Sequence, residues 1–198
     1  MASQPEPNPV PQHADKREAI LDAALELFAE KGFHGTAVPE VAEKAGVGAG
    51  TIYRYFESKE ALVNSVYRRC KESFGRALID DFPRELPVRK QFHVFWTRMV
   101  DFATTQRTAV MFMELHHHAP YIDAKSRASE EMILAAGRAF FDETSRREVT
   151  KAIPSDLVIA LIYGAFSALM KGCWSRQIEL TPEILDAAEN CMWEAIRR

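Results

Sequence analysis

Residues 49–56 carry side chains that could bind DNA. The segment reads Ala-Gly-Thr-Ile-Tyr-Arg-Tyr-Phe and holds three hydroxyl groups and one guanidinium group. Such groups donate hydrogen bonds to phosphate oxygens and to base edges in the major groove. If the segment is a helix, Ile52 and Phe56 lie four residues apart on its inner face, and Thr51 and Tyr55 lie on the opposite side. This pattern predicts the groove-binding second helix of a helix-turn-helix.

The sequence offers little for metal or catalytic chemistry. Three consecutive histidines, His116, His117 and His118, follow closely after Glu114. Consecutive helical residues point about 100° apart, so these imidazoles cannot converge on one ion. A glycine-rich nucleotide-binding loop comes directly after a strand, and no strand precedes Gly48-Ala49-Gly50. No nucleophile and base form a pattern, and we therefore expect no metal site, no cofactor and no catalytic residue.

The composition removes the simplest argument for nucleic-acid binding. The chain has 198 residues, a net charge of −3 and a pI of about 6.1, so it lacks a chain-wide basic excess. The charge is uneven, because residues 47–71 hold five Lys or Arg against two Glu, whereas residues 15–46 hold four against seven acids. Any positive field must therefore be local.

The chain is expected to be cytoplasmic and not to enter a membrane. Its three separated cysteines predict neither disulfides nor zinc and fit a reducing compartment. The first residues lack the basic and apolar regions of a secretory signal. The longest uncharged apolar run, Leu157–Met170, has 14 residues, fewer than the roughly 18 that a membrane-spanning helix needs. We expect this run to be a buried helix.

Apolar residues recur at helical spacing along most of the chain and no segment alternates as a strand does, so the predicted fold class is all-α. Gly32 and Gly46 end the first two helices. Residues 1–13 contain four prolines and are expected to form a disordered leader. Prolines mark the starts of three later helices: Pro120, Pro154 and Pro182. The expected helices span about 16–31, 36–45, 49–56, 59–79, 88–105, 107–117, 121–147, 155–175 and 182–197.

Residues 50–62, Gly-Thr-Ile-Tyr-Arg-Tyr-Phe-Glu-Ser-Lys-Glu-Ala-Leu, resemble part of the N-terminal DNA-binding domain of TetR-type transcriptional regulators. Gly32-Phe33, Thr36 and Val41–Val47 extend the resemblance. It implies an N-terminal three-helix helix-turn-helix domain followed by a C-terminal helical domain for ligand binding and dimerisation. The implied domains are residues 14–60, with the first part of a linking helix at about 59–79, and residues 61–198.

The resemblance also implies a homodimer on a palindromic operator, with a defined set of DNA contacts. Phosphate contacts are implied for Thr36, Tyr53, Tyr55 and Lys59, phosphate or base contact for Thr51, and base contacts for Ala49, Gly50 and Arg54. The alternatives are half-buried packing for the two tyrosines and a solvated surface charge for Arg54.

Aromatic and methionine-rich helices in the second half could line an apolar effector cavity. The candidate ligand-binding residues are Trp96, Met99, Phe102, Phe112, Phe140, Tyr163 and Phe166. The alternative for each is a place in the hydrophobic core.

Small residues spaced three or four apart on the last two expected helices could let a second subunit approach closely. The candidate dimer-interface residues are Ala160, Gly164, Ala168 and Gly172 on one helix and Ala188, Cys191 and Ala195 on the other. Two helices from each subunit would form a four-helix bundle. The alternative is a close helix contact within one chain.

The expected function is that of a homodimeric transcriptional repressor that a small, largely apolar effector releases from double-stranded DNA. One alternative is a helical small-molecule-binding protein or enzyme whose helix-turn-helix is vestigial. Another is an architectural DNA-binding protein without an effector. A steep loss of DNA affinity with salt would separate a working helix-turn-helix from a vestigial one.

Overall fold

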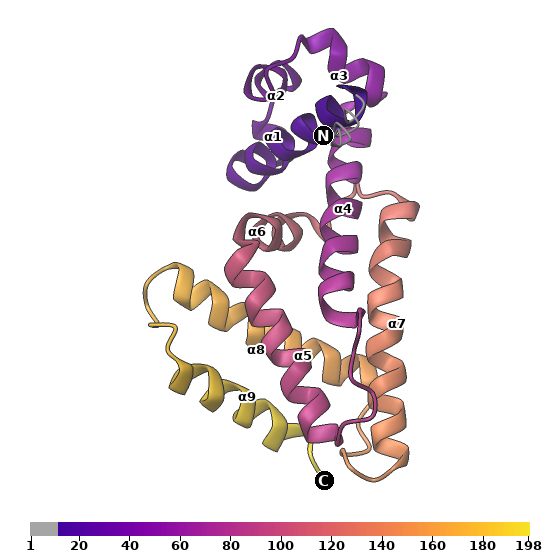
Figure 1. Ribbon diagram of the computed structural model, residues 1–198, viewed down its shortest axis with the longest axis vertical. Coiled ribbons are helices and arrows are strands. Elements are labelled where there is room, and N and C mark those ends of the chain that lie inside the picture. The colour runs from indigo at the N-terminus through magenta and orange to yellow at the C-terminus, as the bar shows by residue number, and fades with distance from the viewer. Residues whose placement is uncertain (1–11) are drawn as a thin grey trace, which may run out of the picture. The chain divides into compact units, whose positions relative to one another are not determined.

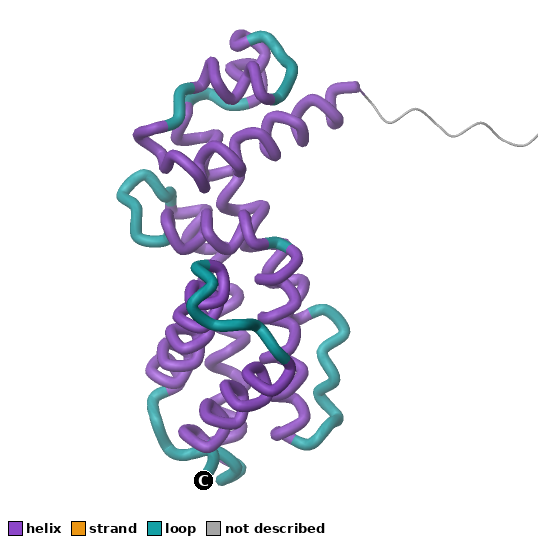
Figure 2. Tube along the Cα trace, turned by 90° about the vertical axis from the view of Figure 1, so that its left-hand side faces the viewer, coloured by secondary structure: helices purple, strands orange, loops and turns teal. Residues whose placement is uncertain are grey.

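The computed structural model describes residues 12–198, and helices joined by loops make up this range (Figures 1 and 2). Within it, one isolated antiparallel bridge pairs Thr150 with Arg197. The all-α prediction is confirmed. Of the expected leader, residues 1–11 lie outside the described residues, and residues 12 and 13 begin the first helix. The helices are α1 (Gln12–Gly35), α2 (Val38–Lys44), α3 (Ala49–Tyr55), α4 (Lys59–Ile79), α5 (Val88–Thr105), α6 (Arg107–His116), α7 (Ala124–Arg146), α8 (Ser155–Trp174) and α9 (Pro182–Ile196).

The described residues form two compact units. Unit 1 contains the described part of residues 1–70 together with Thr108–Ser126, and unit 2 contains Lys71–Arg107 together with Arg127–Arg198. This division differs from the expected domains 14–60 and 61–198 because α6 packs against α1 inside unit 1. The helix-turn-helix is therefore part of a larger unit built from two separate segments of the chain.

Two glycines and a serine set the helix boundaries in unit 1. Gly32 interrupts α1 with a φ of +68°, and Gly46 follows α2 with a φ of +65°. Glycine enters this region of backbone space without steric cost. The Ser58 hydroxyl accepts a hydrogen bond of 3.1 Å from the Ala61 N–H in the first turn of α4. The end of α2 before Gly46 and the start of α4 after Ser58 follow the sequence prediction, whereas Gly32 kinks α1, which continues to Gly35, and α2 begins at Val38 and not at 36.

The helix expected at 121–147 begins later, at Ala124. The residues before it bind the buried side chain of Asn64 on α4. The Asn64 amide donates to the Tyr121 carbonyl at 2.7 Å, and its oxygen accepts from the Asp123 N–H at 2.8 Å. These bonds hold residues 121–123 outside the helix. Pro120 consequently lies in the preceding loop and not at the helix start.

Unit 2 packs α5 against α8 and α9. Trp96 of α5 meets Phe166 of α8 edge-on, with ring centroids 6.3 Å apart. The buried carboxylate of Glu189 on α9 accepts a hydrogen bond from Arg89 and lies 2.7 Å from Nδ1 of His93, both on α5. An ionic contact and an aromatic contact thus connect α5 to its two neighbours.

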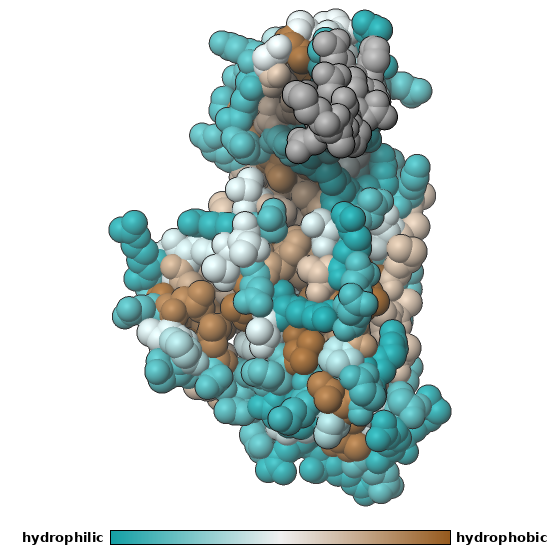
Figure 3. Space-filling model, in the orientation of Figure 1, coloured by the Kyte–Doolittle hydropathy of each residue, from teal (hydrophilic) through white to brown (hydrophobic). Residues whose placement is uncertain are grey.

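One face of α8 is open to solvent, which corrects the expectation of a buried helix. By length and composition alone this 20-residue helix could cross a membrane, with a mean hydropathy of 1.6, yet only 28% of its apolar window is buried. Val158, Ile162 and Phe166 face the core, whereas Leu157 and Leu161 are 49% and 55% exposed. Figure 3 shows apolar surface around the place where α8 passes into the loop before α9.

Candidate DNA-binding surface

α3 rests on a packed base within the helix-turn-helix. Its inward side chains, Ile52 and Phe56, are 1% and 4% exposed, as their spacing predicts. Val41 and Ala42 of α2 are buried as well. A short helix cannot be stable in water by itself. This burial therefore fixes which side of α3 faces outward.

The outward side of α3 carries the polar groups. The Tyr53 side chain is 57% exposed, and Arg54 is exposed beside it. A Cβ atom at Gly50 would meet no other atom within 4 Å, so packing within the chain does not require glycine there. Of the remaining candidates, Ala49 and Gly50 are exposed, and Thr51 and Tyr55 are half-buried.

Thr36 is a correction to the expected phosphate contacts. Its side chain is 2% exposed, and its hydroxyl lies 2.9 Å from the Gly32 carbonyl and 3.1 Å from the Leu27 carbonyl. The hydroxyl donates toward these two acceptors and thereby closes the turn after the α1 kink. A phosphate cannot reach it in this conformation.

Most of the cations counted in residues 47–71 are already paired with acids. The pairs are Arg68 with Asp123 at 3.3 Å, Arg69 with Asp22 at 2.8 Å, and Lys71 with Glu130 at 2.7 Å. Arg54 and Lys59 form no ion pair among the described residues. Lys59, the first residue of α4, places its ammonium 4.4 Å from the centre of the Phe33 ring. The local positive charge that DNA could meet is therefore smaller than the sequence count indicates.

The histidine run contributes to the core of unit 1. His116 is fully buried. In its neutral form, Nε2–H can donate to the Phe28 carbonyl at 3.2 Å while Nδ1 accepts from the Tyr121 hydroxyl at 2.6 Å. His117 Nδ1 lies 3.0 Å from the Glu114 carbonyl. Within residues 12–198, no group of three or more His, Cys, Asp or Glu residues is placed to hold a metal ion.

Stability is expected to depend on pH through His116. Burial lowers the pKa of His116, and the hydrogen bond to the Phe28 carbonyl opposes that shift. At pH values between the lowered pKa of His116 in the folded chain and its ordinary pKa in the unfolded chain, the unfolded chain binds more protons at this site. The free energy of unfolding therefore rises with pH. We expect stability to decrease as the pH falls through the ordinary histidine range near 6.5, by up to about 1.4 kcal/mol per pH unit.

Urea unfolding at a series of pH values between about 5 and 7.5 measures this dependence. The His116→Gln variant is the control, because it cannot titrate at this site. It should be less stable near neutral pH but lose less stability on acidification. An equally steep pH dependence in this variant would contradict the assignment to His116.

Four of the expected ligand-binding residues lie on α5 and α8 of unit 2. Trp96, Met99 and Phe166 are buried there, and the half-buried Tyr163 lies 6.0 Å from the Phe166 ring. Among the described residues, the Trp96 indole N–H is the buried side-chain group without a hydrogen-bond partner. A buried donor without an acceptor costs free energy.

The other three expected ligand-binding residues pack against other aromatic rings. In unit 2, Phe102 packs 5.1 Å from Phe74, and the half-buried Phe140 lies 6.5 Å from Phe82. Phe112 belongs to unit 1, where its ring is 4.4 Å from the His116 ring. It does not join the unit 2 core, because α6 packs within unit 1.

The candidate dimer-interface residues are exposed, except Ala188 and Gly172. Ala160, Gly164 and Ala168 on α8 and Cys191 and Ala195 on α9 are exposed, and Ala188 is half-buried. Gly172 is a correction, because it is buried and a Cβ atom there would lie 2.8 Å from Cδ1 of Ile178. At Gly172 the close contact is therefore within one chain.

Two family models match successive parts of this helical chain. The model described as "Bacterial regulatory proteins, tetR family" matches residues 20–66, and that described as "Tetracyclin repressor-like, C-terminal domain" matches residues 67–198. The chain belongs to the TetR family. The boundary between the two matches falls inside α4 of this TetR family protein.

Individual relatives agree with the family assignment. The HTH-type transcriptional regulator RutR of Escherichia coli O157:H7 is 33% identical over 131 residues, covering 62% of this chain and 61% of that protein. The alignment thus spans about three fifths of the relative's length.

Solved structures of the TetR family resemble the whole fold. A TetR family protein from Vibrio parahaemolyticus is 27% identical with a TM-score of 0.78, covering 92% of this chain and 99% of that one. FadR from Bacillus subtilis, solved in complex with stearoyl-CoA, is 21% identical with a TM-score of 0.70, covering 89% and 95%.

Sequence reasoning missed two residues that hold unit 1 of this TetR family protein together, Asn64 and Tyr121. Their contact joins positions 57 residues apart. Neither residue belongs to an apolar stripe or a capping pattern, so no local signal marks them.

Proposed function

We propose that this TetR family protein is a homodimeric transcriptional repressor that binds an operator through α3 and the start of α4, and that a small apolar effector releases it. The observation that carries the proposal is the seven-residue helix α3, with Ile52 buried on one side and Tyr53 and Arg54 exposed on the other. A B-DNA major groove admits a helix with this division of faces.

The exposed and half-buried groups around α3 suit different parts of a duplex. Hydroxyl and ammonium groups suit phosphates, whereas a methyl group or a guanidinium suits base edges. We assign phosphates to Tyr53, Tyr55 and Lys59, phosphate or base to Thr51, and base edges to Ala49, Gly50 and Arg54.

The exposed face of α8 supports a homodimer. Leu157 and Leu161 flank the small residues Ala160 and Gly164 on a face open to solvent. A two-fold axis beside this face would bury the same apolar patch from both subunits. The dimer would then present two copies of α3 to successive turns of the major groove.

The core around Trp96 supports an apolar effector with one hydrogen-bond acceptor. The unpaired indole N–H can only donate, so it favours a carbonyl, ether or carboxylate oxygen over a pure hydrocarbon. The stearoyl-CoA bound to FadR carries both a long apolar chain and a carbonyl. A thermal-shift screen of such compounds, followed by a DNA-release assay with each hit, tests the effector.

Salt-dependent DNA binding tests the central claim. A duplex selected by the protein from a randomised library, and a mixed-sequence duplex, are titrated by fluorescence anisotropy at several salt concentrations. Lys59→Gln is expected to weaken binding to both duplexes by a similar factor. It should also reduce the salt slope, which is the slope of the logarithm of the binding constant against the logarithm of the salt concentration, by about one, because one phosphate contact is lost. Tyr53→Phe should weaken both without changing the slope.

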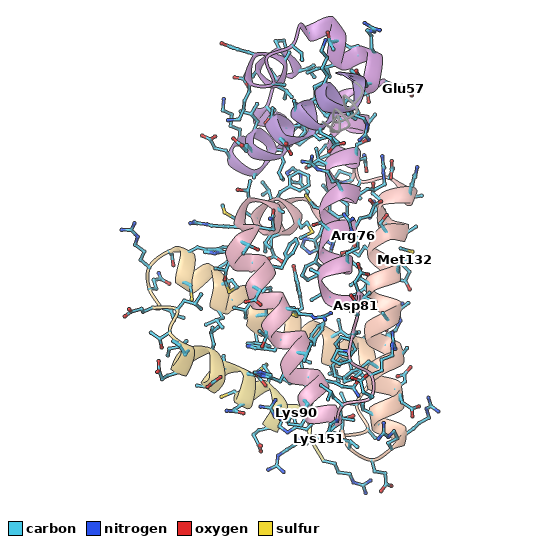
Figure 4. All side chains as sticks on the ribbon, viewed as in Figure 1. Glu57, Arg76, Asp81, Lys90, Met132 and Lys151 are labelled. Atoms are coloured by element: carbon cyan, nitrogen blue, oxygen red, sulfur yellow. The ribbon has the colours of Figure 1, made fainter. Side chains whose placement is uncertain are left out.

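The matched control is Lys90→Gln, a lysine exposed on α5 in unit 2 (Figure 4). It removes the same charge and should leave the salt slope unchanged. Binding of the parent protein that shows no salt dependence would contradict the proposal and favour a helical ligand-binding protein with a vestigial helix-turn-helix.

A further inference from the structure

The aromatic ring of Phe33, and not a carboxylate, contacts the ammonium of Lys59. Its Nζ atom lies 4.4 Å from the centre of the Phe33 ring. Phe33 in turn stacks on Tyr121, with ring centroids 4.1 Å apart and planes 23° from parallel. The Tyr121 hydroxyl lies 2.6 Å from Nδ1 of the buried His116. These residues come from α1, the start of α4, and the end of α6 with its following loop, all in unit 1.

Helix electrostatics disfavour a lysine at position 59. It is the first residue of the 21-residue helix α4, where the aligned peptide dipoles place positive charge and repel a cation. Glu60 suits this end of the helix, and its pKa is lowered by hydrogen bonds from its own backbone N–H and from Ser58. An uncharged residue at position 59 would allow α4 to fold equally well. A cation there increases the attraction of the helix end for an anion.

We infer that Phe33 and Tyr121 are positioning residues for Lys59, holding its ammonium at the start of α4 where a DNA phosphate can bind. The inference rests on the proposed function. A ring face attracts the ammonium electrostatically and leaves its hydrogens free to donate. A carboxylate in the same place would compete with the phosphate and cancel the charge. The ring stack therefore orders the side chain without neutralising it.

The two rings have distinct roles in this arrangement. Phe33 touches the ammonium, whereas Tyr121 supports Phe33 from the loop after α6. The hydroxyl of Tyr121 bonds to His116 and not to Lys59. Tyr121→Phe keeps both rings and is therefore the matched control for Phe33→Leu, which removes the aromatic face but keeps an apolar side chain.

A double-mutant cycle tests the inference. The parent, Phe33→Leu, Lys59→Gln and the double variant are titrated with a fluorescent mixed-sequence duplex of 40 base pairs at low salt. Phe33→Leu should weaken binding about two- to fivefold when Lys59 is present, the size of one exposed cation–π contact. It should have no effect in the Lys59→Gln background. Tyr121→Phe, which keeps the ring that supports Phe33, should lose less affinity than Phe33→Leu.

The outcomes separate the inference from the proposed function. An equal loss for Phe33→Leu in both backgrounds would overturn the inference alone, because the ring would then act through the fold. A loss for Tyr121→Phe as large as that for Phe33→Leu would also overturn it. Unchanged affinity and salt slope for Lys59→Gln would overturn the phosphate contact itself, and the inference with it.

A spectroscopic readout tests the position of Lys59 without DNA. The ε-methylene protons of Lys59 should be shifted upfield by the Phe33 ring current in the parent and in Tyr121→Phe. They should return to ordinary values in Phe33→Leu, with circular dichroism confirming that the variant is folded. Ordinary shifts in the parent protein would contradict the ring contact.

Discussion

The Gly164→Leu variant is expected to remain folded and to become monomeric. A Cβ atom at Gly164 would meet no other atom within 4 Å of the same chain, so the monomer has room for leucine. Leucine also has a higher helix propensity than glycine. In the proposed dimer, the added side chain would overpack the seam once in each subunit. Overpacking costs about 1–3 kcal/mol per site, or about 2–6 kcal/mol per dimer.

Sedimentation velocity over a range of protein concentrations measures this effect. The matched control is Gly172→Leu, because its new Cβ atom would lie 2.8 Å from Cδ1 of Ile178 within the same chain. The control should lower the melting temperature of the monomer, whereas Gly164→Leu should not lower it. A Gly164→Leu protein that dimerises as tightly as the parent would exclude Gly164 from the seam.

The Asn64→Leu variant is expected to lose about 3 kcal/mol of unfolding free energy. Asn64 is buried, and its side chain binds the Tyr121 carbonyl, the Asp123 N–H and the Ser126 hydroxyl. Leucine branches at the same atom but is larger, and it cannot form these bonds. Each buried polar group left unpaired costs about 1–3 kcal/mol.

Urea unfolding at a fixed protein concentration measures the loss, since dimerisation contributes to apparent stability. Ser65→Ala, one residue along α4, is the control. Its hydroxyl donates to the carbonyl of Ala61 one turn earlier, a local bond worth about 1 kcal/mol. Equal stability losses for the two variants would show that the contact between α4 and residues 121–126 contributes little.

Most helix boundaries could be predicted because the signals that set them are local. A glycine with positive φ, such as Gly46, and a serine that caps the next turn, such as Ser58, act within a few residues of their own positions. The burial of Ile52 and Phe56 could be predicted for the same reason, because helical spacing alone places them on one face. The same spacing also predicts which side of α3 faces outward.

The sequence predictions that the structure corrects share a different cause, which is contact between residues distant in sequence. Arg69 belongs to a basic segment by sequence but faces Asp22 in the fold. Gly172 fits the small-residue stripe, but the loop after α8 folds Ile178 back onto it. Phe112 matches an apolar pocket by composition, yet it packs with His116 in unit 1. Residue type and spacing carry no information about such partners.

The construction of unit 1 from two chain segments has a consequence during synthesis. A nascent chain that ends at residue 70 contains the whole helix-turn-helix but lacks α6, so Phe28 and Tyr67 have no Phe112 to pack against. The ribosome must add the residues up to Ser126 before the unit is complete, which takes about 3–10 s at ordinary elongation rates. The packing of unit 1 behind the helix-turn-helix is therefore complete only after its second segment has emerged.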